Sequence, residues 1–442
     1  MCGILGHFGA DVSPHRVRVA AAQMCDAPLG GGCVRRGPGW ALAAGRAATG
    51  GGITAAFEGD IDNRLALFTR LEVRGHAVAD RDEAAVLRSA FELDGAEFPE
   101  HVQGAYAAAV VDARGAPVLV LATDDAGTTP LYYHWDASRE QLCFASEIPA
   151  LLTLLPGRPS LWEPGLDAYL AAGAPLHDRT LIDGVRVLPP GATAVCRRGR
   201  GLRVTRRASA SGRTAPAPGP AASAEPTCLL GAGGPGADLV TDLRGPARQE
   251  LPSVGLAAEQ GAGQGSGQRA EIDAARLPHL LPDLVWRLGQ PDADPAALTA
   301  YVLYESAHRA GFRAALATDP VDEIIDGRAR VETAVRADPP TASGAGAWLA
   351  RYVDGLAAVP GKTRTRLYSS DYRAYLADRG DTAQTLAAQL GEEAAGGARR
   401  AALTRFELDV LLPARGLRRM AHLSGSHSVC ARLPIAPRPA WA

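Results

Sequence analysis

The chain has 442 residues, of which 47% are hydrophobic, with a formal net charge of −2 and an isoelectric point of ≈ 6.6. This length allows two or three domains, and the balanced charge argues against nucleic acid or an anionic membrane as a partner. The seven cysteines have no CxxC or metal-ligand spacing, and their odd number argues against a disulfide framework. We find no signal peptide or membrane-spanning apolar run, and expect a cytoplasmic protein.

Residues 1–205 alternate short apolar runs with turn signals. Strands are predicted over 105–111, 118–122 and 142–145, and helices over 82–93 and 147–155. This mixture indicates an α+β domain with packed sheets.

A composition rich in Ala, Pro, Gly and Ser predicts a flexible linker over residues 206–226. The second predicted domain covers residues 227–442. It begins with a strand over 227–230 that leads into a glycine turn, and it is largely helical over 345–425. A low-complexity stretch, 261–267, interrupts it where a compact α/β domain needs a strand and a helix.

Cys2 directly follows the initiator methionine. Methionine is usually removed before a small residue, which leaves a thiol and a free α-amino group on the same residue. An α-amine titrates near ~7.7–8.0 and can take the thiol's proton, so such a residue supplies both nucleophile and base. The alternative is that Cys2 is a buried apolar residue at the start of a strand.

Several segments in order along the first half resemble the glutaminase domain of asparagine synthetase and other class II glutamine amidotransferases. The matching segments begin at residues 2, 35, 58, 104, 122, 144 and 184. The resemblance implies an N-terminal-nucleophile sandwich of two stacked antiparallel sheets between helices, acting on a glutamine-like substrate.

The resemblance also implies a set of site residues. Cys2 would be the nucleophile, and Arg36, in the segment resembling H-R-G-P-D, would bind the substrate α-carboxylate. In the segment resembling N-G-E-I-Y-N, Gly59 is kept and Asp60 replaces the glutamate. The carboxylate that would bind the substrate amine falls on Glu83 or on its neighbour Asp82.

Glu58 stands where the family has the asparagine that helps to stabilise the tetrahedral oxyanion. A carboxylate there repels the developing charge, and loss of one such donor typically costs ~10²–10³ in rate. Glu58 would help only in its protonated form.

The second half resembles the ATP-dependent synthetase domain of the same superfamily, an α/β fold of the adenine nucleotide α-hydrolase type. Its pyrophosphate loop, S-G-G-x-D-S in the family, falls at residues 232–237, directly after Gly231. Gly233 and Gly234 are kept, but both serines and the aspartate are lost. ATP and Mg²⁺ would be the cofactors if this half is active. No metal site is predicted.

Further remnants of an ATP site are Asp319, Asp322 and Glu323, for which the alternative is a solvated acidic loop. The lysine of the family falls on Arg419, which binds phosphate charge but cannot shuttle protons. Because the site is eroded at several positions together, we expect weak ATP binding or none.

Three functions remain open. The first is ATP- and glutamine-dependent amide-bond formation in specialised metabolism, as in β-lactam synthetases and lasso-peptide cyclases. The second is a non-catalytic pseudoenzyme that pairs with a competent enzyme or carrier protein. The third is an amide hydrolase or acyl transferase that uses Cys2 alone. A homo- or hetero-dimer is expected.

Overall fold

The computed structural model describes residues 3–9, 12–24, 33–76, 78, 82–207, 226–231, 253–256, 268–270, 274–336, 347–395 and 398–434. Cys2, Gly233, Gly234 and the low-complexity stretch 261–267 lie outside these ranges. Of the predicted linker 206–226, only residues 206, 207 and 226 are described. No described helix is long and apolar enough to cross a membrane.

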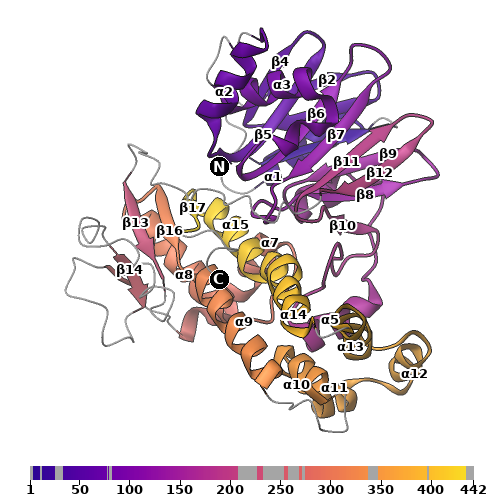
Figure 1. Ribbon diagram of the computed structural model, residues 1–442, viewed down its shortest axis with the longest axis vertical. Coiled ribbons are helices and arrows are strands. Elements are labelled where there is room, and N and C mark those ends of the chain that lie inside the picture. The colour runs from indigo at the N-terminus through magenta and orange to yellow at the C-terminus, as the bar shows by residue number, and fades with distance from the viewer. Residues whose placement is uncertain are drawn as a thin grey trace.

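Two six-stranded antiparallel sheets form the N-terminal half (Figure 1). The first sheet has the order β10-β8-β9-β1-β3-β2 and the second β12-β11-β7-β6-β5-β4. The strands of the first sheet are β1 (Ile4–Phe8), β2 (Cys33–Gly37), β3 (Trp40–Ala44), β8 (Tyr132–Asp136), β9 (Gln141–Ala145) and β10 (Val185–Val187). Those of the second are β4 (Arg46–Gly50), β5 (Ile53–Ile61), β6 (Gly104–Asp112), β7 (Val118–Thr123), β11 (Ala192–Arg197) and β12 (Gly201–Arg206).

The two sheets pack face to face because successive side chains of each strand point to opposite faces. Ile4 and Phe8 of β1 lie in the core between the sheets, whereas Leu5 points outward. Helices α1 (Pro14–Gln23) and α4 (Ile148–Leu154) cover the outer face of the first sheet, and α2 (Arg64–Val73) and α3 (Glu83–Asp94) cover that of the second. A 3₁₀ helix, Gly95–Glu100, follows α3. The predicted sandwich is confirmed.

The C-terminal half contains a parallel sheet of five strands in the order β15-β14-β13-β16-β17. Its strands are β13 (Thr227–Leu230), β14 (Ser253–Leu256), β15 (Gln268–Ala270), β16 (Ala314–Ala317) and β17 (Cys430–Arg432). The helices are α7 (Leu277–Leu288), α8 (Ala296–Arg309), α9 (Asp319–Arg336), α10 (Ala347–Leu356), α11 (Gly361–Leu367), α12 (Ser370–Arg379), α13 (Thr382–Glu393), α14 (Arg399–Phe406) and α15 (Arg418–Ser426), and a 3₁₀ turn, Ala274–Arg276, precedes α7. The predicted helix-rich α/β fold is confirmed.

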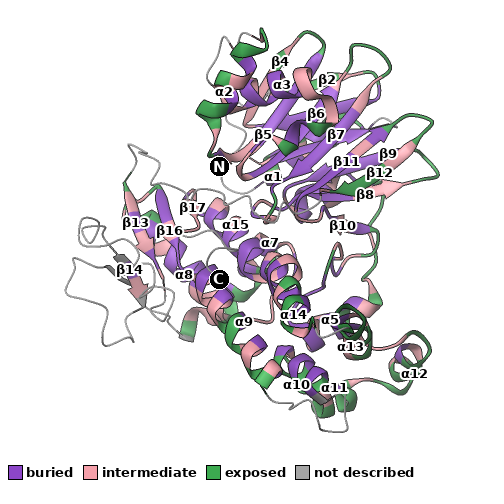
Figure 2. Ribbon diagram, viewed as in Figure 1, coloured by how far each residue is buried: buried purple, intermediate pink, exposed green. Residues whose placement is uncertain are grey.

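One helical stretch, residues 399–426, runs unbroken from α14 to α15 through two π-helical segments, Glu407–Leu411 and Pro413–Leu417. It passes beneath the sandwich (Figure 1). Buried residues concentrate along this stretch as well as along the strands of the sandwich (Figure 2). Wider π turns change the direction of the side chains that follow them, and they are frequent at functional sites.

Helix α5 (Glu163–Ala172) comes early in the sequence but packs with α10, α11 and α13 of the second half. Its Asp167 is buried and accepts hydrogen bonds from the Tyr368 hydroxyl at 2.6 Å and the Thr382 N–H at 2.6 Å. The Arg364 guanidinium lies 3.2 Å from the same carboxylate. The two halves are therefore joined by buried polar contacts as well as by the chain.

Candidate functional site

Glu58 lies near the end of β5, with its carboxyl group turned into the protein. Its Oε2 atom is buried and has no hydrogen-bond partner. Burial raises the pKa of Glu58 to about 7, a hydrogen bond from Ser146 opposes that rise, and the nearby charge of Glu147 adds to it. About half of the molecules therefore carry a protonated Glu58 at neutral pH.

A small cavity of ≈ 30 Å³, room for about one water molecule, adjoins this carboxyl group. It lies where the two halves meet, because its walls come from both: Gly3, Glu58, Thr129, Pro130, Ser146, Glu147, Ala421, His422 and Gly425. Ser146 Oγ accepts a hydrogen bond from the Ile4 N–H at 3.1 Å and so fixes the first described residues beside Glu58. Gly3 follows Cys2 in the sequence, and Cys2 itself is outside the described residues.

His422 of α15 closes the cavity from the side of the C-terminal half. Its Nε2 lies 2.8 Å from the hydroxyl of Tyr132, and the two rings stack. Burial lowers the pKa of His422 to about 3, and the charge of Arg418 lowers it further. The ring is thus neutral at physiological pH and accepts from or donates to Tyr132 without adding charge to the Glu58 cavity.

Gly59 occupies a position in β5 that requires a glycine. Its φ is 111°, and a Cβ atom would lie 2.0 Å from the carbonyl oxygen of Ala105 on the paired strand β6. Only glycine fits such a close approach at positive φ. The carbonyl oxygen of Gly59 accepts a hydrogen bond from Nη2 of Arg46.

Arg46, at the start of β4, joins Gly59 to Glu83. Its Nη1 pairs with Oε2 of Glu83, the first residue of α3, and Glu83 Oε1 accepts from the Ile61 N–H at 3.5 Å. Burial raises the pKa of Glu83, and Arg46 opposes that rise. Asp82 instead caps α3 by accepting from the Ala84 N–H at 3.0 Å. Of the two alternatives, Glu83 is the one beside Gly59.

The sequence predicts Arg36 for the substrate α-carboxylate and does not single out Arg46. Arg36 is exposed on β2, an edge strand of the first sheet, where it pairs in register with Ala41. The side-chain partner of Gly59 and Glu83 among the described residues is Arg46, not Arg36.

Asp60 links the amidotransferase-like half to the end of the chain. Its Oδ2 lies 3.0 Å from Nη2 of Arg432 and 3.9 Å from Sγ of Cys430, both in β17. The neighbouring Asp62 has a raised pKa because it is partly buried, although Arg432 opposes the rise.

Those predicted ATP-site residues that the structure describes lie near the carboxyl ends of β13 and β16, whereas Gly233 and Gly234 are outside the described residues. Gly231 follows β13, and a Cβ atom there would lie 2.3 Å from Oγ1 of Thr318, which follows β16. Asp319 and Asp322 are in the first turn of α9, and the Asp322 N–H donates to the Thr318 carbonyl at 3.0 Å. This is the edge of a parallel sheet at which ligands usually bind.

Arg419 fills the space in front of this edge. Its side chain is 1% exposed. Nε donates to Asp319 Oδ2 at 2.9 Å, and Nη1 contacts Asp294 at 3.1 Å and Asp292 at 3.3 Å. Carboxylates from two segments distant in sequence, residues 292–294 and Asp319, thus converge on one guanidinium. Of the acidic residues predicted from the sequence, Asp319 pairs with Arg419 and its side chain is 29% exposed.

Glu323 lies behind this cluster. Both its carboxyl oxygens are buried without a hydrogen-bond partner, and Oε2 is 4.0 Å from Arg419 Nη2. Burial raises the pKa of Glu323 to about 8, against the opposing charges of Arg419 and Arg415. A neutral Glu323 leaves three carboxylates facing one cation. The described part of the chain has no cluster of His, Cys, Asp or Glu arranged to hold a metal ion.

Two family models match consecutive parts of the chain. A glutamine amidotransferase domain matches residues 47–205, and asparagine synthase matches residues 246–438. The chain belongs to the asparagine-synthetase-like superfamily. No curated protein matches it.

Solved structures similar to this superfamily member include a glutamine phosphoribosylpyrophosphate amidotransferase from B. subtilis, complexed with ADP and GMP (15% identity, 46% of this chain and 49% of that chain, TM-score 0.31). An allosteric regulatory enzyme of purine biosynthesis is 16% identical, over 46% of this chain and 49% of that one, with TM-score 0.32. A glutamine aminotransferase class-II domain protein from Silicibacter pomeroyi is 14% identical, over 47% and 99%, with TM-score 0.26. The aligned part spans about half the length of the first two.

The two halves differ in the chemical groups that they present at the positions of the family's site residues. In the amidotransferase half, Glu58 and Gly59 lie side by side on β5, and Glu58 has a pKa near neutrality. A protonated carboxyl group donates a hydrogen bond where an ionised one would repel an oxyanion. In the asparagine synthase half, the side chain at the position of the family's lysine is bound to carboxylates of its own chain.

Proposed function

We propose that this chain acts in glutamine-dependent amide-bond formation, with its surviving chemistry in the amidotransferase half. The observation that carries the proposal is the buried Glu58 carboxyl group, whose pKa of about 7 keeps a protonated donor available beside Gly59. The loss of the family's asparagine is then compensated by a protonated acid. Cytoplasmic specialised metabolism is the setting we propose.

The proposed reaction is release of ammonia from a glutamine-type amide. The thiolate of Cys2 attacks the γ-carbonyl carbon, and its α-amine takes the thiol proton and passes it to the leaving nitrogen. The oxyanion accepts hydrogen bonds from the Glu58 carboxyl group and the Gly59 N–H. Ammonia leaves, and water then hydrolyses the thioester to the acid and free Cys2.

Substrate recognition is assigned to charged residues around the same strand. Arg46 is our candidate for the α-carboxylate and Glu83 for the α-amine, since these opposite charges pair with each other beside Gly59. Arg36 remains the alternative that the sequence favours. Asp60 forms an ion pair with Arg432 and would couple the position of β5 to that of β17.

We propose that the asparagine synthase half does not activate a carboxylate with ATP. The support is Arg419, which is bound to Asp319, Asp292 and Asp294 and fills the edge where phosphates would lie. Activation would then belong to a partner enzyme or carrier protein, which keeps the partner-only function as the second candidate.

Two measurements on the purified chain separate these functions. Ammonia release from glutamine is compared between wild type and Cys2→Ala, and thermal unfolding is followed with and without MgATP. We expect Cys2-dependent ammonia release and no stabilisation by MgATP. Absence of ammonia release would leave the partner-only function, whereas saturable stabilisation by MgATP with substrate-dependent pyrophosphate release would refute our assignment of the second half.

A further inference from the structure

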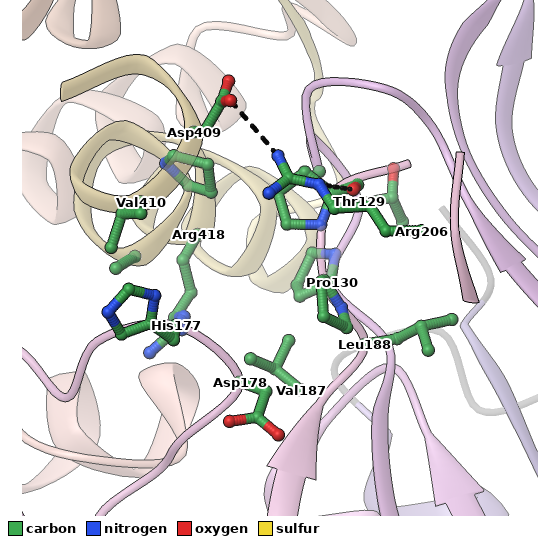
Figure 3. Close-up of a pocket in the computed structure, with 15 residues that line it drawn as sticks. Thr129, Pro130, His177, Asp178, Val187, Leu188, Arg206, Asp409, Val410 and Arg418 are labelled. Atoms are coloured by element: carbon green, nitrogen blue, oxygen red, sulfur yellow. Dashed lines mark hydrogen bonds and ion pairs between the residues drawn. The ribbon is translucent and has the colours of Figure 1, made fainter. Parts of the chain in front are cut away.

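A second and larger cavity lies at the junction of the two halves. Its volume is ≈ 220 Å³, and the close-up in Figure 3 shows residues of both halves around it. The sandwich supplies residues of four segments and the helical stretch supplies the rest: Gly127, Thr129, Pro130, His177, Asp178, Val187, Leu188, Pro189, Pro190, Arg206, Asp409, Val410, Pro413, Ala414 and Arg418. We call it the Arg418 pocket. It takes no part in the reaction proposed above.

Arg418 is the unusual residue of this pocket. It is 6% exposed, and its buried Nε and Nη1 atoms have no hydrogen-bond partner. Figure 3 shows its side chain reaching from the helix toward the loop that carries His177 and Asp178. A buried guanidinium without an anion is costly, so proteins normally pair it. Arg418 lacks a carboxylate within ion-pair distance among the described residues.

The other charges that line the pocket are already paired. Asp178 binds Arg186, and Asp409 lies 3.3 Å from Arg206. Burial lowers the pKa of His177, which favours its neutral form. The pocket thus has one uncompensated positive charge, which belongs to Arg418.

The residues that line the pocket indicate the polarity and charge of the ligand that would fit it. Val187, Leu188 and Val410 offer apolar surface, and prolines also line the pocket. Asp178 and Asp409, although paired, disfavour a dianion such as phosphate. A planar guanidinium matches a carboxylate in shape and charge.

The pocket is also held in shape from the sandwich side. The buried Asp124 carboxylate accepts hydrogen bonds from the Ala126 N–H at 2.9 Å and the Thr128 N–H at 3.0 Å. These bonds fix the loop that ends in Thr129 and Pro130, and the same two residues line the Glu58 cavity on their other side.

We propose that the Arg418 pocket binds a small organic monocarboxylate, with the carboxylate on Arg418 and an apolar body against Val187, Leu188 and Val410. Because the ligand would touch both halves, it would hold helix α15 against the sandwich. Binding is independent of Cys2 and of ATP, so its test stands apart from that of the proposed function.

The test is thermal unfolding and calorimetric titration of the full chain with 3-methylbutanoate, hexanoate and benzoate, each compared with its neutral amide at constant ionic strength. Inorganic phosphate is a separate arm. We expect at least one carboxylate to stabilise the wild type saturably, with no effect of its amide or of phosphate. Arg418→Gln should weaken that binding by about tenfold to a hundredfold, as for loss of a charge-assisted hydrogen bond.

Two further variants make the result specific. Exposed Arg203 lies on β12 outside the pocket, so Arg203→Gln should bind the carboxylate as the wild type does. Val410→Phe should abolish binding by filling the pocket while Arg418 stays in place. The proposal is overturned if no carboxylate outperforms its amide, if phosphate alone binds, or if Arg418→Gln binds as tightly as the wild type.

Discussion

Replacement of Glu58 by glutamine separates a protonated donor from an ionised carboxylate without changing the size of the side chain. With a pKa of about 7, Glu58 is protonated in roughly nine of ten molecules at pH 6 and in roughly one of ten at pH 8. Glutamine donates through its amide at both pH values. If the protonated carboxyl group stabilises the oxyanion, the ratio of wild-type to Glu58→Gln activity should fall about tenfold from pH 6 to pH 8.

The ratio is the informative quantity because Cys2 also titrates. Its α-amine must be unprotonated to act as base, so the absolute rate of either protein rises with pH near ~7.7–8.0. That contribution is common to both proteins and cancels. Glu58→Ala gives the scale of the effect, since removal of one oxyanion donor costs ~10²–10³ in rate.

The assay is ammonia release from saturating glutamine between pH 5.5 and 8.5, with Cys2→Ala as the background. A ratio that stays constant across this range would show that Glu58 is not the donor. A ratio that rises with pH would show that the ionised carboxylate is the active form, contrary to our reasoning from charge.

Three more outcomes follow from the buried charges and from β5. Arg419→Met should cost about 1.5–3 kcal/mol in the free energy of unfolding, because it removes the charge-assisted hydrogen bonds between a buried guanidinium and three partly exposed carboxylates. In urea titration, the exposed Arg400→Met should change the free energy of unfolding little. Glu323 has a raised pKa in the folded state, so the folded protein holds its proton at pH values where the unfolded chain has lost it. As the pH rises from about 4.5 to 8, the free energy of unfolding of the wild type should therefore fall more steeply than that of Glu323→Gln, by up to about 1.4 kcal/mol per pH unit. Gly59→Ala should lower both the melting temperature and ammonia release, because its Cβ would collide with the Ala105 carbonyl.

The elements of the sandwich could be predicted because local patterns determine them. The strand expected over 105–111 is β6 (Gly104–Asp112), and the helix expected over 82–93 is α3 (Glu83–Asp94). Alternation and capping residues are visible within a few positions of the chain. That α5 packs with the C-terminal half was not predictable in this way, because its partners are the distant helices α10, α11 and α13.

The chemistry of the site depends on residues that are distant in sequence. Glu58 reads as a repulsive carboxylate until Ser146 and α15 are seen to bury it. Arg419 reads as a phosphate-binding cation until Asp292, Asp294 and Asp319 are found around it. A pKa is set by burial and by neighbouring charges, neither of which a local pattern contains.

Helix α15 connects these observations. Arg418 and His422 are one turn apart on the helix, so they share the face that meets the sandwich, while Arg419 points toward the carboxylates at the end of the parallel sheet. Anchoring by Arg419 therefore fixes the position from which His422 closes the Glu58 cavity and Arg418 enters its pocket. On the proposed function, Arg419 acts as a positioning residue that supports the wall of the Glu58 cavity. Loss of Arg419 should consequently disturb ammonia release, even though the residue lies outside the Glu58 cavity.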